Sequence, residues 1–161
     1  TGGEFSVSAD GTDAAVTPTN VTIKRQSSHG AANVDAQPAG NAVLFLQRAK
    51  RKIRELAYNY DSDGYVAPDL TILNETVTDS GITEMAYQQA PDSILWCVRD
   101  DGVLAGLTYQ RTDNVVAWHR HIVGGKSDTG KNIIQQKINF TANSMLLLIQ
   151  LLEYQAVVFI M

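Results

Sequence analysis

The segment from Ile82 to Gly125 reads ITEMAYQQAPDSILWCVRDDGVLAGLTYQRTDNVVAWHRHIVGG, and it decides the fold class. Short apolar runs alternate here with turn residues, which predicts four strands in succession: Ile82–Gln88, Ser93–Val98, Val103–Gln110 and Val115–Val123. Each connector contains the Pro, Gly, Asp or Asn that a short antiparallel turn requires. The segment therefore predicts a four-stranded antiparallel meander, of roughly the 40 to 45 residues that form one blade of a β-propeller.

The second of these strands is apolar on both faces. Ile94, Trp96 and Val98 point to one side of it, while Leu95 and Cys97 point to the other. A sheet with one face in water does not have such a strand, so we expect this sheet to be stacked between neighbours. Four large side chains are predicted to form the structural core of the meander: Trp96, Leu104, Tyr109 and Trp118.

The residues before this meander also read as β structure. Strands are predicted at Asn20–Gln26, Ala42–Gln47 and Lys52–Tyr60, and the turn residues Asp63 and Gly64 follow the last of them. Together they predict most of a second blade between Asn20 and Leu73. A closed propeller needs at least about four blades. The predicted fold class is therefore mainly β, with antiparallel meanders resembling propeller blades in an incomplete propeller, and a helix near the C-terminus.

Composition narrows the function classes. The chain has 161 residues with a net charge of -4, which argues against a general affinity for nucleic acid, since that requires a clustered basic face. One short basic stretch is the exception, and it is a candidate for contact with DNA phosphates or with another subunit: Arg48, Lys50, Arg51, Lys52 and Arg54. The alternative is exposed charge on a hairpin turn. The single cysteine, Cys97, cannot form an internal disulfide, so the fold must rest on packing alone.

Two longer strings carry a resemblance to a known family. They are KIRELAYNYDSDGYVAPDLTIL, from Lys52 to Leu73, and MAYQQAPDSILWCVRDDGVLAGLTYQRTDNVVAWHRH, from Met85 to His121. Residues 1–125 resemble the tail tubular or tail nozzle proteins of short-tailed bacteriophages. The resemblance implies a virion protein, made in the host cytoplasm, that forms a homo-oligomeric ring below the portal and adaptor. Such a ring encloses the channel through which the genome leaves, contacts DNA in passing and has no catalytic centre.

The sequence after Gly125 resembles nothing in that family. We therefore predict two regions, a β domain at 1–125 and an unassigned tail at 126–161, as in a fragment whose gene is truncated or frame-shifted. The apolar segment Met145–Met161 is just shorter than a bilayer span and is interrupted by polar residues. A helix at Ser144–Tyr154 followed by a β-branched run is favoured over a membrane span.

The string GGKSDTGKN, from Gly124 to Asn132, nearly matches a phosphate-binding loop. Lys131 would contact phosphate in such a loop, but Asn132 replaces the Ser or Thr that binds magnesium. The preceding strand also belongs to an antiparallel meander, whereas the motif requires a parallel strand that leads into a helix. The string is therefore interpreted as a linker, and no cofactor is predicted.

Two further patterns have residue types that occur in metal sites. His119 and His121 share one strand face, with Cys97 as a candidate third ligand, yet Cys97 reads as a core side chain. Asp61, Asp63 and Gly64 lack the other ligands of a calcium loop. No metal site and no catalytic residues are predicted, because nothing pairs a nucleophile with a base. The alternative function is a carbohydrate- or host-surface-binding β domain of a tail, which exposed aromatic residues on one rim would favour.

Overall fold

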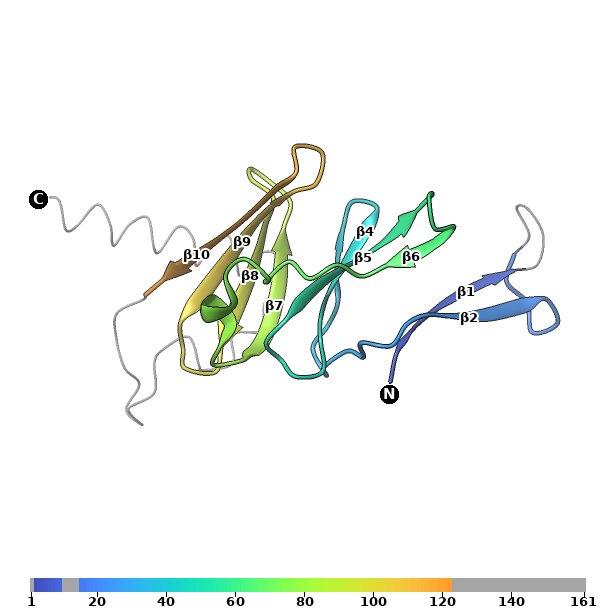
Figure 1. Cartoon of the computed structure of the whole chain (residues 1–161), viewed down its shortest axis with the longest axis horizontal. Helices are drawn as coiled ribbons and strands as arrows, with labels where there is room; N and C mark the ends of the chain where they lie inside the picture. Colours follow the sequence, from blue (N-terminus) through green and yellow to red (C-terminus); the bar gives the residue numbers. More distant parts are fainter. Residues whose placement is uncertain (1, 10–14, 123–161) are drawn as a thin grey trace, which may run out of the picture.

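The computed structural model of the protein describes residues 2–9 and 15–122, and these residues form three antiparallel sheets (Figure 1). A two-stranded ribbon consists of β1 (Glu4–Ala9) and β2 (Val21–Ser27). The next sheet has the order β3-β4-β5-β6: Gln37–Ala39, Ala42–Leu46, Ile53–Asn59 and Gly64–Val66. The last sheet has the order β10-β9-β8-β7: Val115–His121, Leu104–Gln110, Ile94–Arg99 and Ile82–Gln88. A 3-10 helix, η1 (Glu75–Thr78), lies between the two larger sheets in the chain.

The meander from Ile82 onward is confirmed. The four strands β7 to β10 pair in chain order, and their bounds lie within two residues of the predicted ones wherever the structure describes them. Turn residues explain this success. Gly102, between β8 and β9, has a φ of 78°, and Asn114, between β9 and β10, has a φ of 55°. Glycine and asparagine adopt positive φ angles more readily than other residues. Their positions in the sequence therefore indicate where the chain turns back.

The prediction of a second blade starting at Asn20 is wrong in its first strand. The strand predicted at Asn20–Gln26 is β2, but it pairs with β1 in a separate ribbon. The first strand of the β3–β6 sheet is instead β3 itself, which pairs with β4. Apolar partners explain the pairing of β2, because Val7 faces Ile23 across the ribbon. The two larger sheets do not close into a ring within the described residues.

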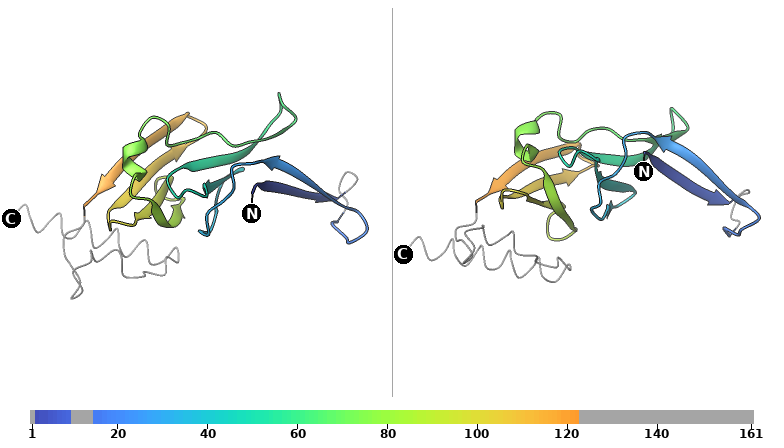
Figure 2. Two further views of the ribbon diagram at one scale, coloured as in Figure 1. Left: turned by 60° about the horizontal axis from the view of Figure 1, so that its bottom comes forward. Right: turned by 90° about the horizontal axis from the view of Figure 1, so that it is seen from below.

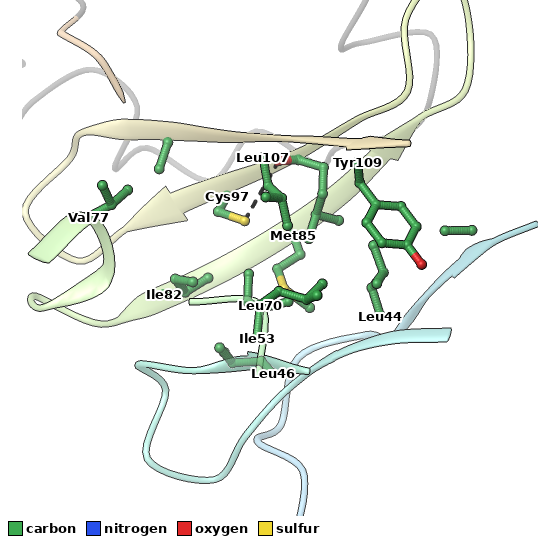
Figure 3. Packing of buried hydrophobic residues seen from close by; sticks show 13 residues of the cluster. Leu44, Leu46, Ile53, Leu70, Val77, Ile82, Met85, Cys97, Leu107 and Tyr109 are labelled. Atoms are coloured by element: carbon green, nitrogen blue, oxygen red, sulfur yellow. Dashed lines mark hydrogen bonds between the residues drawn. The ribbon is translucent and has the colours of Figure 1, made fainter. Parts of the chain in front are cut away.

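The hydrophobic core lies between the two four-stranded sheets (Figure 3). Both sheets and the segment that joins them contribute to it: Ala39, Leu44, Leu46, Ile53, Leu70, Val77, Ile82, Met85, Leu95, Cys97, Ala105, Leu107 and Tyr109. Because strand residues alternate between faces, each sheet presents one face to this core. The sheets are therefore stacked on this face of β8. The second neighbour, expected on its opposite face, stays a prediction.

The four predicted core residues lie on both faces of the β7–β10 sheet. Tyr109 is buried within the core between the sheets. Trp118 is half-buried at the margin of this core, where its Nε1 donates to the backbone oxygen of Leu70 at 2.9 Å. Trp96 and Leu104 are also buried, but they belong to the opposite face of the sheet. The four side chains therefore do not form one cluster.

Polar contacts fix the two sheets relative to each other. Glu55 is buried on the core-facing side of β5. Its Oε1 forms an ion pair with Arg111 Nε at 2.9 Å. Arg111 also donates from Nη1 to Asn41 Oδ1 at 3.0 Å. Burial, and then the nearby charge of Glu55, raises the pKa of Tyr109 above its ordinary value, so this phenol stays neutral. The ion pair with Arg111 compensates the cost of burying the Glu55 carboxylate.

A second polar cluster surrounds Arg99, at the end of β8. Its guanidinium is buried and donates to the backbone oxygen of Val77 at 2.6 Å and to Ser80 Oγ at 2.9 Å. The carboxylates of Asp79 and Asp101 lie at 3.1 and 2.6 Å from Nη2. One side chain therefore ties η1 and the β8–β9 turn to the end of the central strand β8.

Candidate interaction surfaces

Three tyrosines form an exposed cluster on the outer face of β5 and β6, which we call the tyrosine rim: Tyr58, Tyr60 and Tyr65. Tyr58 and Tyr60 share a face because they are two residues apart at the end of β5, and Tyr65 pairs with Tyr58 across the hairpin. The Tyr58 ring makes edge contacts with the other two, at centroid distances of 5.0 and 5.6 Å. Tyr60 is 90% exposed, so one complete aromatic face is open to a ligand.

Polar groups of the β5–β6 turn border the tyrosine rim. The Tyr58 hydroxyl donates a short hydrogen bond to the Asp63 carboxylate, and the Asn59 side chain accepts from the backbone nitrogens of Asp61 and Ser62. The hydrogen bond to Asp63, and to a lesser degree burial, raises the pKa of Tyr58 above its ordinary value. The rim therefore combines aromatic faces with hydroxyl and carboxylate groups.

The predicted basic stretch occupies the β4–β5 turn, and the structure divides it. Lys52 forms ion pairs with Asp69 at 2.9 Å and Glu75 at 3.0 Å. Arg54 donates to Gln47 Oε1 and to the backbone oxygen of Ala67. These two side chains thus serve the fold. The remaining three are exposed at the surface: Arg48, Lys50 and Arg51.

Acidic residues interrupt the surface next to these three cations. An open cavity of about 300 Å³ is lined by Lys50 and Arg51, and also by Asp79 and Asp100. Mixed charge of this kind does not give the continuous basic face that phosphate binding favours. The turn suits a polar contact with another protein subunit better than a track for DNA.

Asp69, the partner of Lys52, gives a pH-dependent prediction. Burial alone would raise its pKa, but hydrogen bonds from Thr71 and Lys52 outweigh burial and lower the pKa below 3.8. A lowered folded-state pKa means that the stabilisation is present above pH 3.8 and is lost as the pH falls through the folded value. We expect Asp69→Asn to lower the free energy of unfolding by about 1–2 kcal/mol at pH 7.

Urea unfolding of both proteins between pH 7 and pH 2.5 measures this effect. The difference between wild type and Asp69→Asn should shrink steadily below pH 3.8, while an exposed control, Asp113→Asn, should differ little from wild type at any pH. A difference that stays constant down to pH 2.5 would show that the Asp69 charge does not contribute.

His119 and His121 lie side by side on β10, with Nδ1 of the first 2.7 Å from Nε2 of the second. Trp96 packs against both rings, at centroid distances of 5.7 and 5.2 Å. The suggested third ligand is excluded, because Cys97 follows Trp96 and therefore points into the core on the other face. Among the described residues, no group of three metal-binding side chains occurs. Within the described residues, the two histidines are hydrogen-bonded to each other.

The His119 ring packs directly against Gly106. A Cβ at this position would lie 2.1 Å from His119 Cε1, so any larger residue must displace the ring. Burial, and then the charge of His121, lowers the pKa of His119, which is consistent with a ring enclosed by its neighbours. We expect Gly106→Ala to destabilise the fold by about 1–2 kcal/mol, since the displaced ring leaves Trp96 uncovered.

The control for this prediction is the same change in a His119→Ala background. There the steric conflict is gone, and alanine suits a strand better than glycine, so Gly106→Ala should be neutral or stabilising. The two effects form a double-mutant cycle measured by urea unfolding. Equal effects of Gly106→Ala in both backgrounds would refute the seating of His119 on Gly106.

The other candidate sites from the sequence lie in a turn or outside the described residues. Asp61 and Asp63 belong to the β5–β6 turn, where Asp63 adopts a φ of 45° and accepts from Tyr58 rather than joining a ligand loop. The string from Gly124 to Asn132, the predicted helix at Ser144–Tyr154 and the whole 126–161 tail lie outside the described residues. Within residues 2–9 and 15–122, no helix has the length and apolarity to span a bilayer.

Two features of the surface were not identified from sequence. The tyrosine rim requires the pairing of Tyr58 with Tyr65, and only the alternation in RELAYNY hinted that Tyr58 and Tyr60 share a face. The ribbon of β1 and β2 exposes the apolar side chains of one face, and the segment EFSVSA that forms β1 was not assigned a strand.

Comparison of the sequence with models of known protein families gives no match. Comparison with curated proteins gives no significant match.

Proposed function

We propose that this chain is a structural subunit of a short-tailed phage tail, part of a nozzle or tubular ring through which the genome is delivered. In this role it has no catalytic activity. It assembles with further copies of itself and with the portal and adaptor proteins, and DNA passes through the channel of the ring. Its place is the virion, after synthesis in the cytoplasm of the bacterial host.

The observation that carries the proposal is the resemblance in residues 1–125, whose strings fall on β5 and on the three strands β8 to β10. RELAY falls within β5, PDSILWCVR ends with β8, DGVLAGLTY leads into and runs along β9, and AWHRH lies in β10. A mainly β subunit with exposed apolar side chains on its surface is suited to permanent assembly, since obligate interfaces are more apolar than ordinary surfaces.

Electron microscopy of the purified full-length chain tests this function. We expect closed rings of one diameter, and light scattering after gel filtration should give a single multiple of the monomer mass. The genes beside its own should encode portal, adaptor and capsid proteins. A chain that stays monomeric at high concentration and whose gene has no such neighbours would contradict the proposal.

The tyrosine rim favours a second candidate function, binding of a carbohydrate on the host surface. Exposed aromatic faces bordered by hydroxyl and carboxylate groups suit sugar rings. A glycan array with the full-length chain tests this candidate. Binding that is lost in Tyr60→Ala but kept in Leu73→Ser, at the other end of the molecule, would support it, and no binding by wild type would exclude it.

A further inference from the structure

The β1–β2 ribbon has one polar and one mainly apolar face. Its polar face is internally bonded: Gln26 Nε2 donates to Ser6 Oγ at 2.6 Å, and Ser27 Oγ donates to Glu4. The other face is mainly apolar, and we call it the ribbon face; it carries Arg25, opposite Phe5, and four apolar side chains: Phe5, Val7, Val21 and Ile23. These four side chains are between 39% and 63% exposed. The usual arrangement of a sheet, with its apolar face covered, is absent from the described part of this ribbon.

An isolated two-stranded ribbon is marginally stable in water, because it has too little buried apolar surface to offset the entropy of ordering it. The ribbon face therefore fits a surface that is covered in an assembly. The ribbon projects from one end of the elongated molecule (Figure 1, Figure 2). Its polar face meets the neighbouring sheet only at its base, where the Tyr65 backbone nitrogen donates to Gln26 Oε1 at 3.3 Å.

A second apolar surface lies at the opposite end of the molecule, along β10. Trp118 donates to the backbone oxygen of Leu70, so the segment that follows Leu70 lies beside this strand. The surface, which we call the end patch, consists of Ile72, Leu73 and Ile122. Leu73 is 92% exposed and Ile122 is 88% exposed. The ribbon face and the end patch cannot meet within one copy, because the two large sheets separate them (Figure 2).

The combined size of the two surfaces matches a specific interface. Their exposed apolar area is on the order of 900 Å², and roughly 60% of a protein interface is apolar, so the contact would bury roughly 1,500 Å² in total. Stable complexes bury about 1,600 Å². A contact between opposite ends of identical copies is heterologous, and such contacts close into rings when the rotation between copies permits it.

We propose that the ribbon face of one copy docks on the end patch of the next copy, and that this head-to-tail contact builds the ring. The inference rests on the proposed function and specifies its assembly surface. It places the ribbon as an arm that reaches the neighbouring subunit, and it leaves the tyrosine rim outside the contact. The ribbon then gains the apolar partner that it lacks within one chain.

Crosslinking between two cysteine variants of the full-length chain tests the proposal. One variant carries Val7→Cys in the ribbon face, and the other carries Leu73→Cys in the end patch. Cys97 is present in both, but it is fully buried and burial raises its pKa, so it does not react and wild type serves as the blank. A short bismaleimide should join the two variants when they are mixed, and it should join neither variant to itself.

The outcomes separate this contact from the function on which it rests. Rings that form without a crosslink in the mixture would overturn the head-to-tail contact and leave the proposed function intact. Self-crosslinking of Val7→Cys would also overturn it, in favour of a ribbon-to-ribbon contact. The absence of both rings and crosslinks would contradict the inference and the proposed function together.

Assembly of further variants provides a second measurement. Ile23→Ser in the ribbon face should weaken ring formation at least tenfold, because Ile23 is the most exposed apolar side chain of this face and the desolvated centre of an interface carries most of the binding energy. Tyr60→Ser removes an aromatic side chain that is even more exposed than Ile23 and lies outside the contact, so this variant should assemble like wild type. Equal assembly of wild type and Ile23→Ser, or an equal loss in Tyr60→Ser, would refute the assignment of the surface.

Discussion

Replacing Leu107 by alanine should lower the free energy of unfolding by about 3–4 kcal/mol. Leu107 is fully buried in the centre of β9, where it pairs with Leu95 on β8 and with Trp118 on β10. Its side chain belongs to the core between the two sheets (Figure 3). Truncation removes apolar contacts and leaves a cavity that paired strands on both sides cannot easily close, so we expect a loss near the middle of the range for leucine.

Urea unfolding followed by tryptophan fluorescence measures this loss. Val43→Ala is the matched control, because Val43 also lies in a central strand of a four-stranded sheet but is 38% exposed. The control should lose only about 1 kcal/mol, since the change removes two carbon atoms from a side chain that is already partly in water. A Leu107→Ala protein within 1 kcal/mol of wild type would show that the sheets do not stack around this residue.

Local chemistry made most of the strands predictable. The alternation of side chains and the turn residues between Ile82 and His121 placed four strands in the right order, because neighbouring strands in a meander pair with each other. Strand propensity does not choose a partner over longer distances. The strand at Asn20–Gln26 was predicted as a strand, yet its partner is β1 rather than the sheet that follows it.

The elements that were missed are short or depend on distant partners. β3 has three residues, Gln37–Ala39, and includes a proline, so its sequence carries almost no strand signal. It is a strand because β4 pairs with it. The geometry of the surfaces has the same origin. Whether Cys97 lies on the same sheet face as His119 depends on the register of β8, β9 and β10. This register cannot be read from the sequence.

Buried polar partners were beyond prediction for a related reason. Nothing in the run Ile94–Arg99 indicates that Arg99 would meet Asp79 or Val77, because these residues lie 20 and 22 positions away in the sequence. The same holds for Glu55 and Arg111, which come from different sheets. Such pairs form only after the sheets stack, and the stacking itself is decided by apolar residues.

In the Arg99 cluster, we expect removal of the two partner carboxylates to lower the free energy of unfolding more than removal of the arginine. Removing both carboxylates, in Asp79→Ala/Asp101→Ala, leaves the guanidinium buried without a counter-charge. We expect a loss of about 2–3 kcal/mol, at the low end for buried ion pairs because the two carboxylates are 53% and 40% exposed and solvent screens them. Arg99→Met should lose only about 1–2 kcal/mol, because water can solvate the released carboxylates and the main loss is the hydrogen bond to Val77.

Urea unfolding of the three proteins at pH 7 gives this order directly. Asp61→Ala/Asp113→Ala removes two exposed carboxylates elsewhere and should stay within about 0.5 kcal/mol of wild type for each substitution. If Arg99→Met is instead the least stable variant, the arginine acts mainly through its packing and hydrogen bonds, and its charge does not need compensation. If the double variant equals wild type, the guanidinium finds water in place of the carboxylates, and the cluster contributes nothing to the anchoring of η1.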